Sequence, residues 1–251
     1  MNIRRGLYHV YWFLRGIIAP RLRYSQDEYE ETLREFVQKD KEWLDLGCGH
    51  SLLPSWRAEE ERELVSNCKR LVGIDYDMAS LREHNTLSSR LRGDITMLPF
   101  KDGSFDIMTA NMVVEHLDNP LRQFREINRC LRSSGVFLFH TPNARDYGVI
   151  LVKLVPDWLV ERIVRILEGR HSHDVFKTYY RANTEDQVAA IAKETGFKIL
   201  AVRMVNSDAI FALVPPLAFF ELLWLRVLMT EPFRSWRNNM IVVLQKSETC
   251  A

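Results

Sequence analysis

The central part of the chain alternates short apolar runs with amphipathic segments, and this alternation constrains the fold more than any other feature. Runs that stop at turn residues, such as 42–46, are typical of buried strands, whereas 120–132 repeats apolar residues at helical spacing. Strands that alternate with helices form a parallel sheet with helices on both faces, so the sequence predicts an α/β fold. The expected strands are 42–46, 70–74, 91–95, 104–110, 136–139, 197–205 and 240–244, and the expected helices are 52–65, 78–88, 120–132 and 184–195.

Composition narrows the class of protein further. With 251 residues, 47% of them hydrophobic, and a net charge of +1, the chain can bury a sizeable core and is not disordered. The near-neutral charge gives no electrostatic reason to expect a nucleic-acid partner. The four cysteines form no CxxC pair, which argues against a disulfide framework or a zinc cluster. We therefore expect a cytoplasmic protein and predict no metal site.

Polar residues follow the predicted strands at the points where the strands end. Gly47 and Gly49 follow the first strand and would let a ligand approach the backbone, although such a turn also serves plain strand-to-helix geometry. Leu52 stands where a dinucleotide fingerprint needs its third glycine, which argues against a nicotinamide cofactor. Asp75 could accept from both hydroxyls of a ribose, and Asp94 from an exocyclic amine. Ligands of such sheets bind at this edge.

These motifs, taken together, resemble those of the class I S-adenosylmethionine-dependent methyltransferases, in the small-molecule group that includes the ubiquinone-pathway enzymes. The resemblance runs from Trp43 to Asn143 and implies a Rossmann-like seven-stranded sheet with helices on both faces, and helical insertions that form a cap. It also implies that the chain is an enzyme whose cofactor is S-adenosylmethionine. The motifs that carry it are Leu44-Asp45-Leu46-Gly47-Cys48-Gly49, Val72-Gly73-Ile74-Asp75, Gly93-Asp94-Ile95, Ser104-Phe105-Asp106, Glu115-His116-Leu117 and, later, Glu194-Thr195-Gly196-Phe197.

The resemblance also implies roles for single residues. The implied cofactor-binding residues are Asp45, Gly47, Cys48, Gly49, Asp75, Tyr76, Asp94, Ile95 and Asn111. Two positions depart from the family pattern. Ser51 replaces a frequent third glycine, and Met112 replaces the first glutamate of a segment that is linked to a metal in the ubiquinone-pathway O-methyltransferases. Glu115 and His116 alone are weak evidence for a metal, so none is predicted.

Methyl transfer to a hydroxyl benefits from a general base. His116 and His140 follow the fourth and fifth predicted strands and are the catalytic candidates, although each also fits a structural histidine. Residues 144–183 lie where the family commonly places an acceptor-binding insertion. The candidate substrate-binding residues there are His173, Tyr179, Tyr180 and Arg181, which suit a polar or anionic group but fit a helix-docking corner equally well.

Apolar segments flank this central region. Residues 1–40 are expected to form a basic amphipathic segment, with Arg4, Arg5 and Arg15 among the apolar residues. Residues 41–251 are expected to form the methyltransferase domain, with insertions at 144–183 and 207–237. Proline and charged residues interrupt the second insertion, so neither segment is predicted to span a membrane. Each either lies on a membrane surface or packs on its own domain as a cap.

The sequence thus predicts S-adenosylmethionine-dependent methyl transfer to a small-molecule acceptor, at an oxygen of an apolar, lipid-like or lipid-linked compound. The expected partners are this acceptor and, peripherally, a membrane, with no nucleic acid; the sequence gives no oligomeric state. Two alternatives remain open, namely a methyltransferase of a soluble natural product or sugar and a non-catalytic S-adenosylmethionine-fold binding protein. A nucleic-acid methyltransferase is disfavoured because residues 111–114 lack its proline-aromatic signature.

Overall fold

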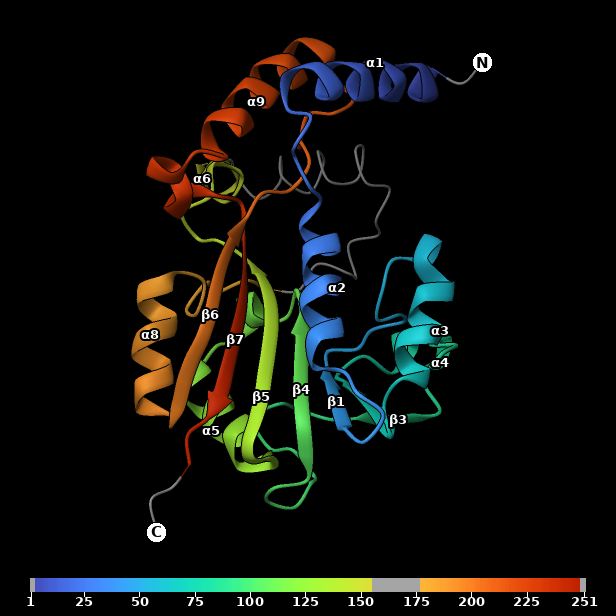
Figure 1. The fold of residues 1–251 in the computed structure, drawn as a ribbon, viewed down its shortest axis with the longest axis vertical. Coiled ribbons are helices and arrows are strands. Elements are labelled where there is room, and N and C mark those ends of the chain that lie inside the picture. The colour runs from blue at the N-terminus through green and yellow to red at the C-terminus, as the bar shows by residue number, and fades with distance from the viewer. Residues whose placement is uncertain (1–2, 155–176, 249–251) are drawn as a thin grey trace. The chain divides into compact units, whose positions relative to one another are not determined.

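The computed structural model describes residues 3–154 and 177–248, and seven strands in this part of the chain form one sheet (Figure 1). The order of the strands in the sheet is β3-β2-β1-β4-β5-β7-β6. The strands are β1 (Glu42–Leu46), β2 (Arg70–Asp75), β3 (Ser89–Arg92), β4 (Phe105–Asn111), β5 (Leu131–Pro142), β6 (Phe197–Val205) and β7 (Asn239–Lys246). The predicted seven-stranded α/β fold is therefore confirmed.

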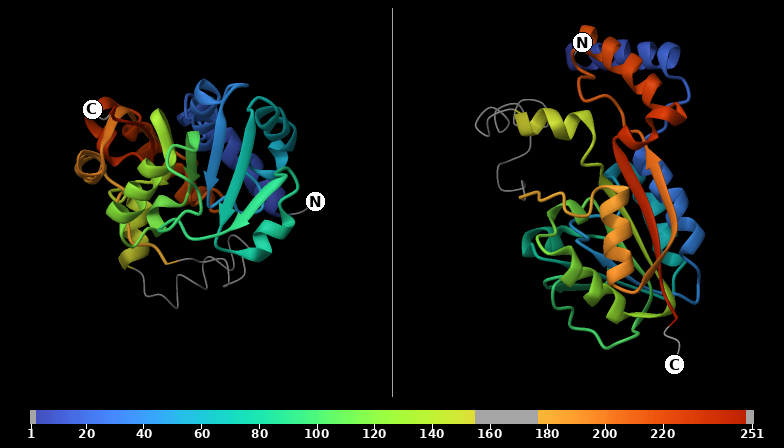
Figure 2. Two further views of the ribbon diagram at one scale, coloured as in Figure 1. Left: turned by 90° about the horizontal axis from the view of Figure 1, so that it is seen from below. Right: turned by 90° about the vertical axis from the view of Figure 1, so that its left-hand side faces the viewer.

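The described helices alternate with these strands, as the sequence pattern predicted. The α-helices are α1 (Ile3–Ile18), α2 (Ser25–Phe36), α3 (Ala58–Ser66), α4 (Met78–Glu83), α5 (Pro120–Cys130), α6 (Tyr147–Leu154), α8 (Glu185–Glu194) and α9 (Pro215–Leu228). Short 3-10 helices are η1 (Ser55–Arg57), η2 (Val114–His116) and η4 (Glu231–Trp236). Figure 2 shows helices on both sides of the sheet, which explains why the strands at its centre are buried along most of their length.

The sheet is mixed, and this differs from the parallel sheet that the alternation predicts. Strands β3, β2, β1, β4 and β5 pair in parallel, so their carboxyl ends lie along one edge. Figure 1 shows β7 running against its neighbours β5 and β6. Because β1 and β4 are neighbours in the sheet but not in the sequence, the switch point at which ligands bind in such folds lies between them.

Two predicted elements end earlier than expected. Helix α4 stops at Glu83 because His84 takes an extended conformation, and its Nδ1 accepts from the backbone N–H groups of Thr86 and Leu87, each at 3.4 Å. Strand β3 stops at Arg92 rather than at Ile95, because Gly93 N–H turns to the Asp75 carbonyl at 3.0 Å. The residues after β3 therefore form a turn.

The described chain forms two compact units, and the larger one contains most of the sheet. It comprises residues 30–141, 177–203 and 241–248. Phe124 on α5 is completely buried in its core, where its ring contacts Phe137, Phe139 and Phe197 edge to face. Aromatic pairs in this arrangement add to the stabilisation from burial alone.

The smaller unit is helical and includes residues 3–29, 142–154 and 204–240 of the described chain. Its core joins α1 to α9, which lie side by side in Figures 1 and 2 although they are far apart in the sequence. The core residues are Tyr11, Ile18, Ala19, Leu22, Ala209, Ala218, Leu222, Leu225 and Leu228. Within residues 3–154 and 177–248, the structure contains no helix that combines the length and apolarity needed to cross a bilayer.

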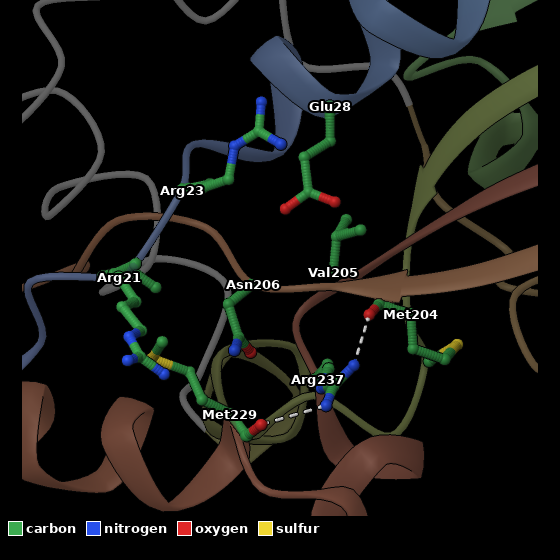
Figure 3. Close-up of a pocket in the computed structure, with 9 residues that line it drawn as sticks. Arg21, Arg23, Glu28, Met204, Val205, Asn206, Met229 and Arg237 are labelled. Atoms are coloured by element: carbon green, nitrogen blue, oxygen red, sulfur yellow. Dashed lines mark hydrogen bonds between the residues drawn. The ribbon is translucent and has the colours of Figure 1, made fainter.

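A single arginine closes the carboxyl end of α9 in this unit. Arg237 donates to the carbonyls of Leu228, Met229 and Met204 at 3.0–3.1 Å, and Figure 3 shows the bonds to the last two. Because the last carbonyls of a helix lack partners within the helix, this guanidinium satisfies acceptors that α9 leaves open. The pocket beside it has a volume of about 180 Å³.

Candidate functional site

The turn after β1 is shaped by two glycines with positive φ angles, Gly47 at 65° and Gly49 at 53°. A side chain at Gly47 would also clash with Val113, whose Cγ2 lies 2.4 Å from the position of an added Cβ. An added Cβ at Gly49, in contrast, meets no atom within 4 Å. Gly47 is therefore needed for close packing, whereas Gly49 presents backbone to open space, as a ligand-binding turn requires. The Cys48 side chain is buried beside Gly73.

Asp75, at the end of β2, ties this turn to the next one. Its Oδ2 accepts from Gly49 N–H at 2.8 Å and its Oδ1 accepts from Asp77 N–H at 2.7 Å. A carboxylate oxygen has two lone pairs, so each oxygen can still accept a bond from a ligand hydroxyl. Tyr76 follows with an exposed ring, and the Arg92 guanidinium lies 5.6 Å from its centre. The predicted residues Gly49, Asp75 and Tyr76 thus lie together.

Asp94 and Ile95 lie in the turn after β3, one position along the same edge. Asp94 Oδ1 accepts from Thr96 N–H at 2.7 Å, which fixes the exposed carboxylate in the turn. Ile95 is half-buried beside it. The interpretation of 91–95 as one strand was wrong, since β3 ends at Arg92, but the turn keeps both residues at the carboxyl edge of the sheet.

Asp45 is the buried carboxylate of the site. Its Oδ1 accepts from the Thr109 hydroxyl, which in turn accepts from Trp43 Nε1–H at 2.6 Å. Burial raises the pKa of the Asp45 carboxyl to about 7, an effect that the Thr109 hydrogen bond only partly offsets. Nearby Asp75 raises this pKa further by charge repulsion. A cationic ligand beside Asp45 would relieve this repulsion and favour the ionised carboxylate.

The end of β4 brings Asn111 and His140 together. His140 Nδ1 lies 2.9 Å from Asn111 Oδ1 and donates to it, which leaves the basic lone pair of the imidazole on Nε2. Burial lowers the pKa of His140 to about 4, so the ring is neutral at physiological pH. The next residue, Met112, has a φ of 57°. A left-handed conformation is costly for methionine, and such residues concentrate at functional sites.

A buried polar chain follows at η2. The Glu115 carboxylate is buried, which raises its pKa, and its Oε2 accepts from the Thr141 hydroxyl at 2.9 Å. The Thr141 hydroxyl accepts from Asn183 Nδ2 at 2.7 Å. His116, at the rim, donates from Nδ1 to the Lys177 carbonyl at 3.0 Å, and its Nε2 is 3.9 Å from Glu115 Oε1.

The predicted substrate residues divide into two groups. His173 lies outside the described residues. Tyr179 and Tyr180 both donate their backbone N–H to the Glu115 carbonyl, at 2.7 and 3.2 Å, so they adjoin the buried polar chain. Cations flank the Tyr179 ring, with Lys177 Nζ at 5.0 Å and the Arg181 guanidinium at 5.4 Å. Arg181 also donates to the Asp118 carbonyl.

Sequence reasoning missed Thr141 and Asn183 and gave Glu115 no role of its own. Nothing in their local sequence marks them, because their hydrogen bonds join residues 26 and 42 positions apart. Val113, which fixes the need for glycine at position 47, was missed for the same reason. An apolar residue after a strand gives no sign of the backbone that it will touch.

Comparison with known proteins agrees with this geometry. A family model described as "Methyltransferase domain" matches residues 44–139, which include β1 to most of β5. A Mycolicibacterium smegmatis protein, described as a probable S-adenosylmethionine-dependent methyltransferase, is 29% identical over 136 residues, 53% of this chain and 46% of that protein. The malonyl-[acyl-carrier protein] O-methyltransferase of Legionella pneumophila is 30% identical over 104 residues, 39% of this chain and 35% of that one.

Solved structures show the same fold. The S-adenosylmethionine-dependent methyltransferase of Mesorhizobium loti has a TM-score of 0.54 at 16% identity, covering 88% of this chain and all of that one. The [4+2]-cyclase SpnF has a TM-score of 0.55 at 19% identity, covering 89% of this chain and 82% of its own. At these identities the likeness concerns the fold alone. SpnF is described as a cyclase and not as a methyltransferase, so the fold does not by itself fix the reaction.

Residues 44–139 thus match a methyltransferase domain and are similar to S-adenosylmethionine-dependent methyltransferases, and S-adenosylmethionine is the cofactor that this similarity indicates. The matched family model is the methyltransferase domain at residues 44–139. The chain spans about half the length of the Mycolicibacterium relative and about a third of the Legionella one.

Proposed function

We propose that the protein transfers a methyl group from S-adenosylmethionine to an oxygen of an apolar, lipid-like acceptor. The observation that carries this proposal is the convergence of Gly49, Asp75 and His116 on the carboxyl edge of one parallel sheet region. The first two form a cofactor-binding turn, and the third is a candidate base. The proposal therefore places cofactor binding and proton removal at the same edge of the sheet.

Different residues of the chain would bind different parts of the cofactor. Asp75 accepts from the ribose hydroxyls, and Asp94 and Ile95 border the adenine. Gly47, Cys48 and Gly49 offer backbone to the methionine end, and buried Asp45 attracts its positive charge. Asn111, held by His140, borders the reacting end. When bound, S-adenosylmethionine supplies a methyl group on a sulfonium that is already a good leaving group.

The protein must then align the acceptor and remove its proton. His116 is the base in this proposal, because its Nδ1 proton is held by the Lys177 carbonyl and the lone pair is on Nε2. His116 Nε2 would accept the hydroxyl proton of the acceptor as its oxygen takes up the methyl group that bound S-adenosylmethionine would supply, with S-adenosylhomocysteine as the other product. His140 acts as a positioning residue, since its low pKa makes it a weak base.

Two properties of the proposed acceptor, its reacting oxygen and its apolar character, rest on separate observations. The Legionella relative is an O-methyltransferase by name. The apolar character rests on the exposed aromatic and aliphatic side chains of α1 and α9. An acceptor of this kind resides in a lipid phase, so we expect peripheral contact with a membrane. A water-soluble natural product or sugar is the second candidate, favoured by the cation-flanked Tyr179 ring, which suits a polar group.

The test begins with cofactor binding. Calorimetric titration with S-adenosylmethionine and S-adenosylhomocysteine should give micromolar binding that Asp75→Asn loses, because the new amide N–H group would face the backbone N–H of either Gly49 or Asp77. Asp77→Asn is the matched control, since asparagine also caps α4 and should leave affinity unchanged. A folded wild-type protein that binds neither ligand would overturn the cofactor assignment and favour a scaffold.

Methyl transfer is then measured with tritium-labelled cofactor and paired acceptors. Each pair is a long-chain alcohol and its short, water-soluble counterpart, because an alcohol oxygen must lose a proton to the base. We expect transfer to the long-chain member and a rate about 10²–10⁴-fold lower in His116→Asn, with unchanged cofactor affinity. Transfer only to the short members would support the soluble-acceptor alternative instead, and a fully active His116→Asn enzyme would exclude His116 as the base.

A further inference from the structure

The outward face of α9 is apolar although it is exposed. One side of the helix is buried against α1 through Ala218, Leu222, Leu225 and Leu228. The opposite side carries exposed large apolar side chains, and the Phe220 ring is 67% exposed. These exposed residues are Leu217, Phe219, Phe220, Leu223, Trp224 and Val227. A helix that is apolar all round normally lies in a core or in lipid, so the exposed side requires a covering partner.

Helix α1 carries exposed apolar side chains of its own. Tyr11 and Ile18 point into the core shared with α9, which leaves the other sides of α1 free of that contact. Trp12, Phe13 and Ile17 are exposed on them, and Phe13 is 68% exposed. Because α1 and α9 pack side by side within one unit, their exposed residues belong to one helical layer (Figures 1 and 2). We call the exposed apolar residues of α1 and α9 the aromatic surface.

The exposed charges on α1 and α9 themselves have one sign, whereas the exposed Glu231 beside α9, on η4, is paired with Arg237. Arg4, Arg5 and Arg226 are exposed on the two helices, and α1 contains no acidic residue. The single acid of α9, Glu221, is buried, and its carboxylate accepts from Ile210 N–H and Phe211 N–H at 2.7 and 2.8 Å. The two helices therefore expose basic groups beside apolar ones and expose no acid.

This combination matches one kind of partner. Aromatic side chains insert at the boundary between lipid headgroups and acyl chains, and arginines contact the phosphates. The described helices are too short or too polar to span a bilayer, so contact would be limited to its surface. A second copy of the chain fits less well, because a two-fold interface through this face would bring the same arginines together.

We propose that α1 and α9 form an interfacial surface that docks the protein on an anionic lipid bilayer. The aromatic surface enters the headgroup region, and Arg4, Arg5 and Arg226 contact lipid phosphates. This inference deepens the proposed apolar acceptor but does not depend on the methyl-transfer reaction, because docking requires neither cofactor nor acceptor.

The test is flotation of the full chain with two kinds of vesicle. One kind is phosphatidylcholine alone, and the other contains about 30 mol% phosphatidylglycerol, which makes the surface negative. We expect binding to the anionic vesicles and at least tenfold weaker binding by Phe220→Ser. Trp56→Ser is the matched control, because Trp56 is 73% exposed on η1 in the other unit and should bind as wild type does. Equal losses in the two variants would overturn the proposal.

Charge is tested in the same assay. Arg5→Glu should weaken binding at low salt, and the difference should shrink at high salt because salt screens exposed charges. Lys198→Glu, an exposed charge reversal on β6, is the control. Absence of vesicle binding by the wild-type protein would overturn the proposal. A wild-type protein that binds no vesicles but forms a dimer, which Phe220→Ser converts to a monomer, would show that a second copy covers this surface. Calorimetry with S-adenosylmethionine on the same samples separates a failure of docking from a failure of the cofactor site.

Discussion

If the cofactor binds beside Asp45 as proposed, this residue should couple cofactor binding to pH. Its pKa of about 7 in the free protein means that the carboxyl is largely protonated below neutrality. A ligand that carries a sulfonium and an ammonium favours the ionised form, so binding must release a proton at low pH. The free energy of unfolding depends on pH in the opposite direction. Because the pKa of Asp45 is raised by folding, its contribution to the stability of the free protein is present at low pH and is lost as pH rises through 7.

We therefore predict that affinity for S-adenosylmethionine falls as pH decreases from 7 to 6, by up to about tenfold. The measurement is calorimetric titration in two buffers of different ionisation enthalpy, which also counts the released protons. Asp45→Asn should bind more weakly and show little change over this range. An affinity that is constant between pH 6 and 8 in the wild-type protein would show that no cationic group binds beside Asp45.

At the scale of an element, the turn after β1 contains two glycines, Gly47 and Gly49, that are needed for different reasons. Gly47 has a positive φ and no room for a Cβ, whereas Gly49 has a positive φ and open space. Close packing against Val113 therefore makes position 47 a requirement of folding. At position 49 we propose that glycine is needed for ligand access, because a side chain there would occupy the open space beside the backbone.

Alanine substitutions should separate these two effects. Gly47→Ala should cost about 2–4 kcal/mol of unfolding free energy, from backbone strain and overpacking. Gly49→Ala should cost only about 1–2 kcal/mol of strain, yet lower the affinity for S-adenosylmethionine at least tenfold. Urea denaturation and calorimetry measure the two quantities. Equal stability losses in both variants would contradict the contact between position 47 and Val113.

At the scale of the molecule, the first helix is joined to residues near the end of the chain. The Tyr11 hydroxyl donates to Asp208 Oδ1 at 3.0 Å and accepts from Ala209 N–H at 3.2 Å. Arg15, one turn later, pairs with the same carboxylate at 2.9 Å. Residues at both ends of the sequence thus build one core, and α9 depends on α1 for the burial of its inner side.

Removing this hydroxyl should destabilise the smaller unit. Tyr11→Phe leaves the buried Ala209 N–H without its acceptor and removes one of the two bonds to Asp208, which should cost about 1–3 kcal/mol. Thermal and urea unfolding give the value, and Tyr8→Phe, an exposed tyrosine on the same helix, is the control that should leave stability unchanged. If both variants unfold like the wild-type protein, the Tyr11 hydroxyl does not link α1 to residues 208–209 in solution.

Local patterns predicted what depends on neighbours in the sequence. Apolar runs located the strands, and helical spacing located α5. The capping residue Thr184 accepts from Gln187 N–H at 3.3 Å at the start of α8, as its motif indicates. The motifs at the strand ends carry the family resemblance that indicated the cofactor, and a parallel sheet brings these ends to one edge.

The sequence by itself therefore determined the α/β fold and indicated the cofactor, and it predicted the edge of the sheet at which the candidate cofactor-binding residues lie. Only the tertiary structure decided the direction of β7, the buried chain from Glu115 through Thr141 to Asn183, and the pairing of α1 with α9. These features rest on contacts between residues far apart in the sequence. Local periodicity shows that a helix has an apolar side, but the packing partner decides which apolar side chains are buried and which remain exposed.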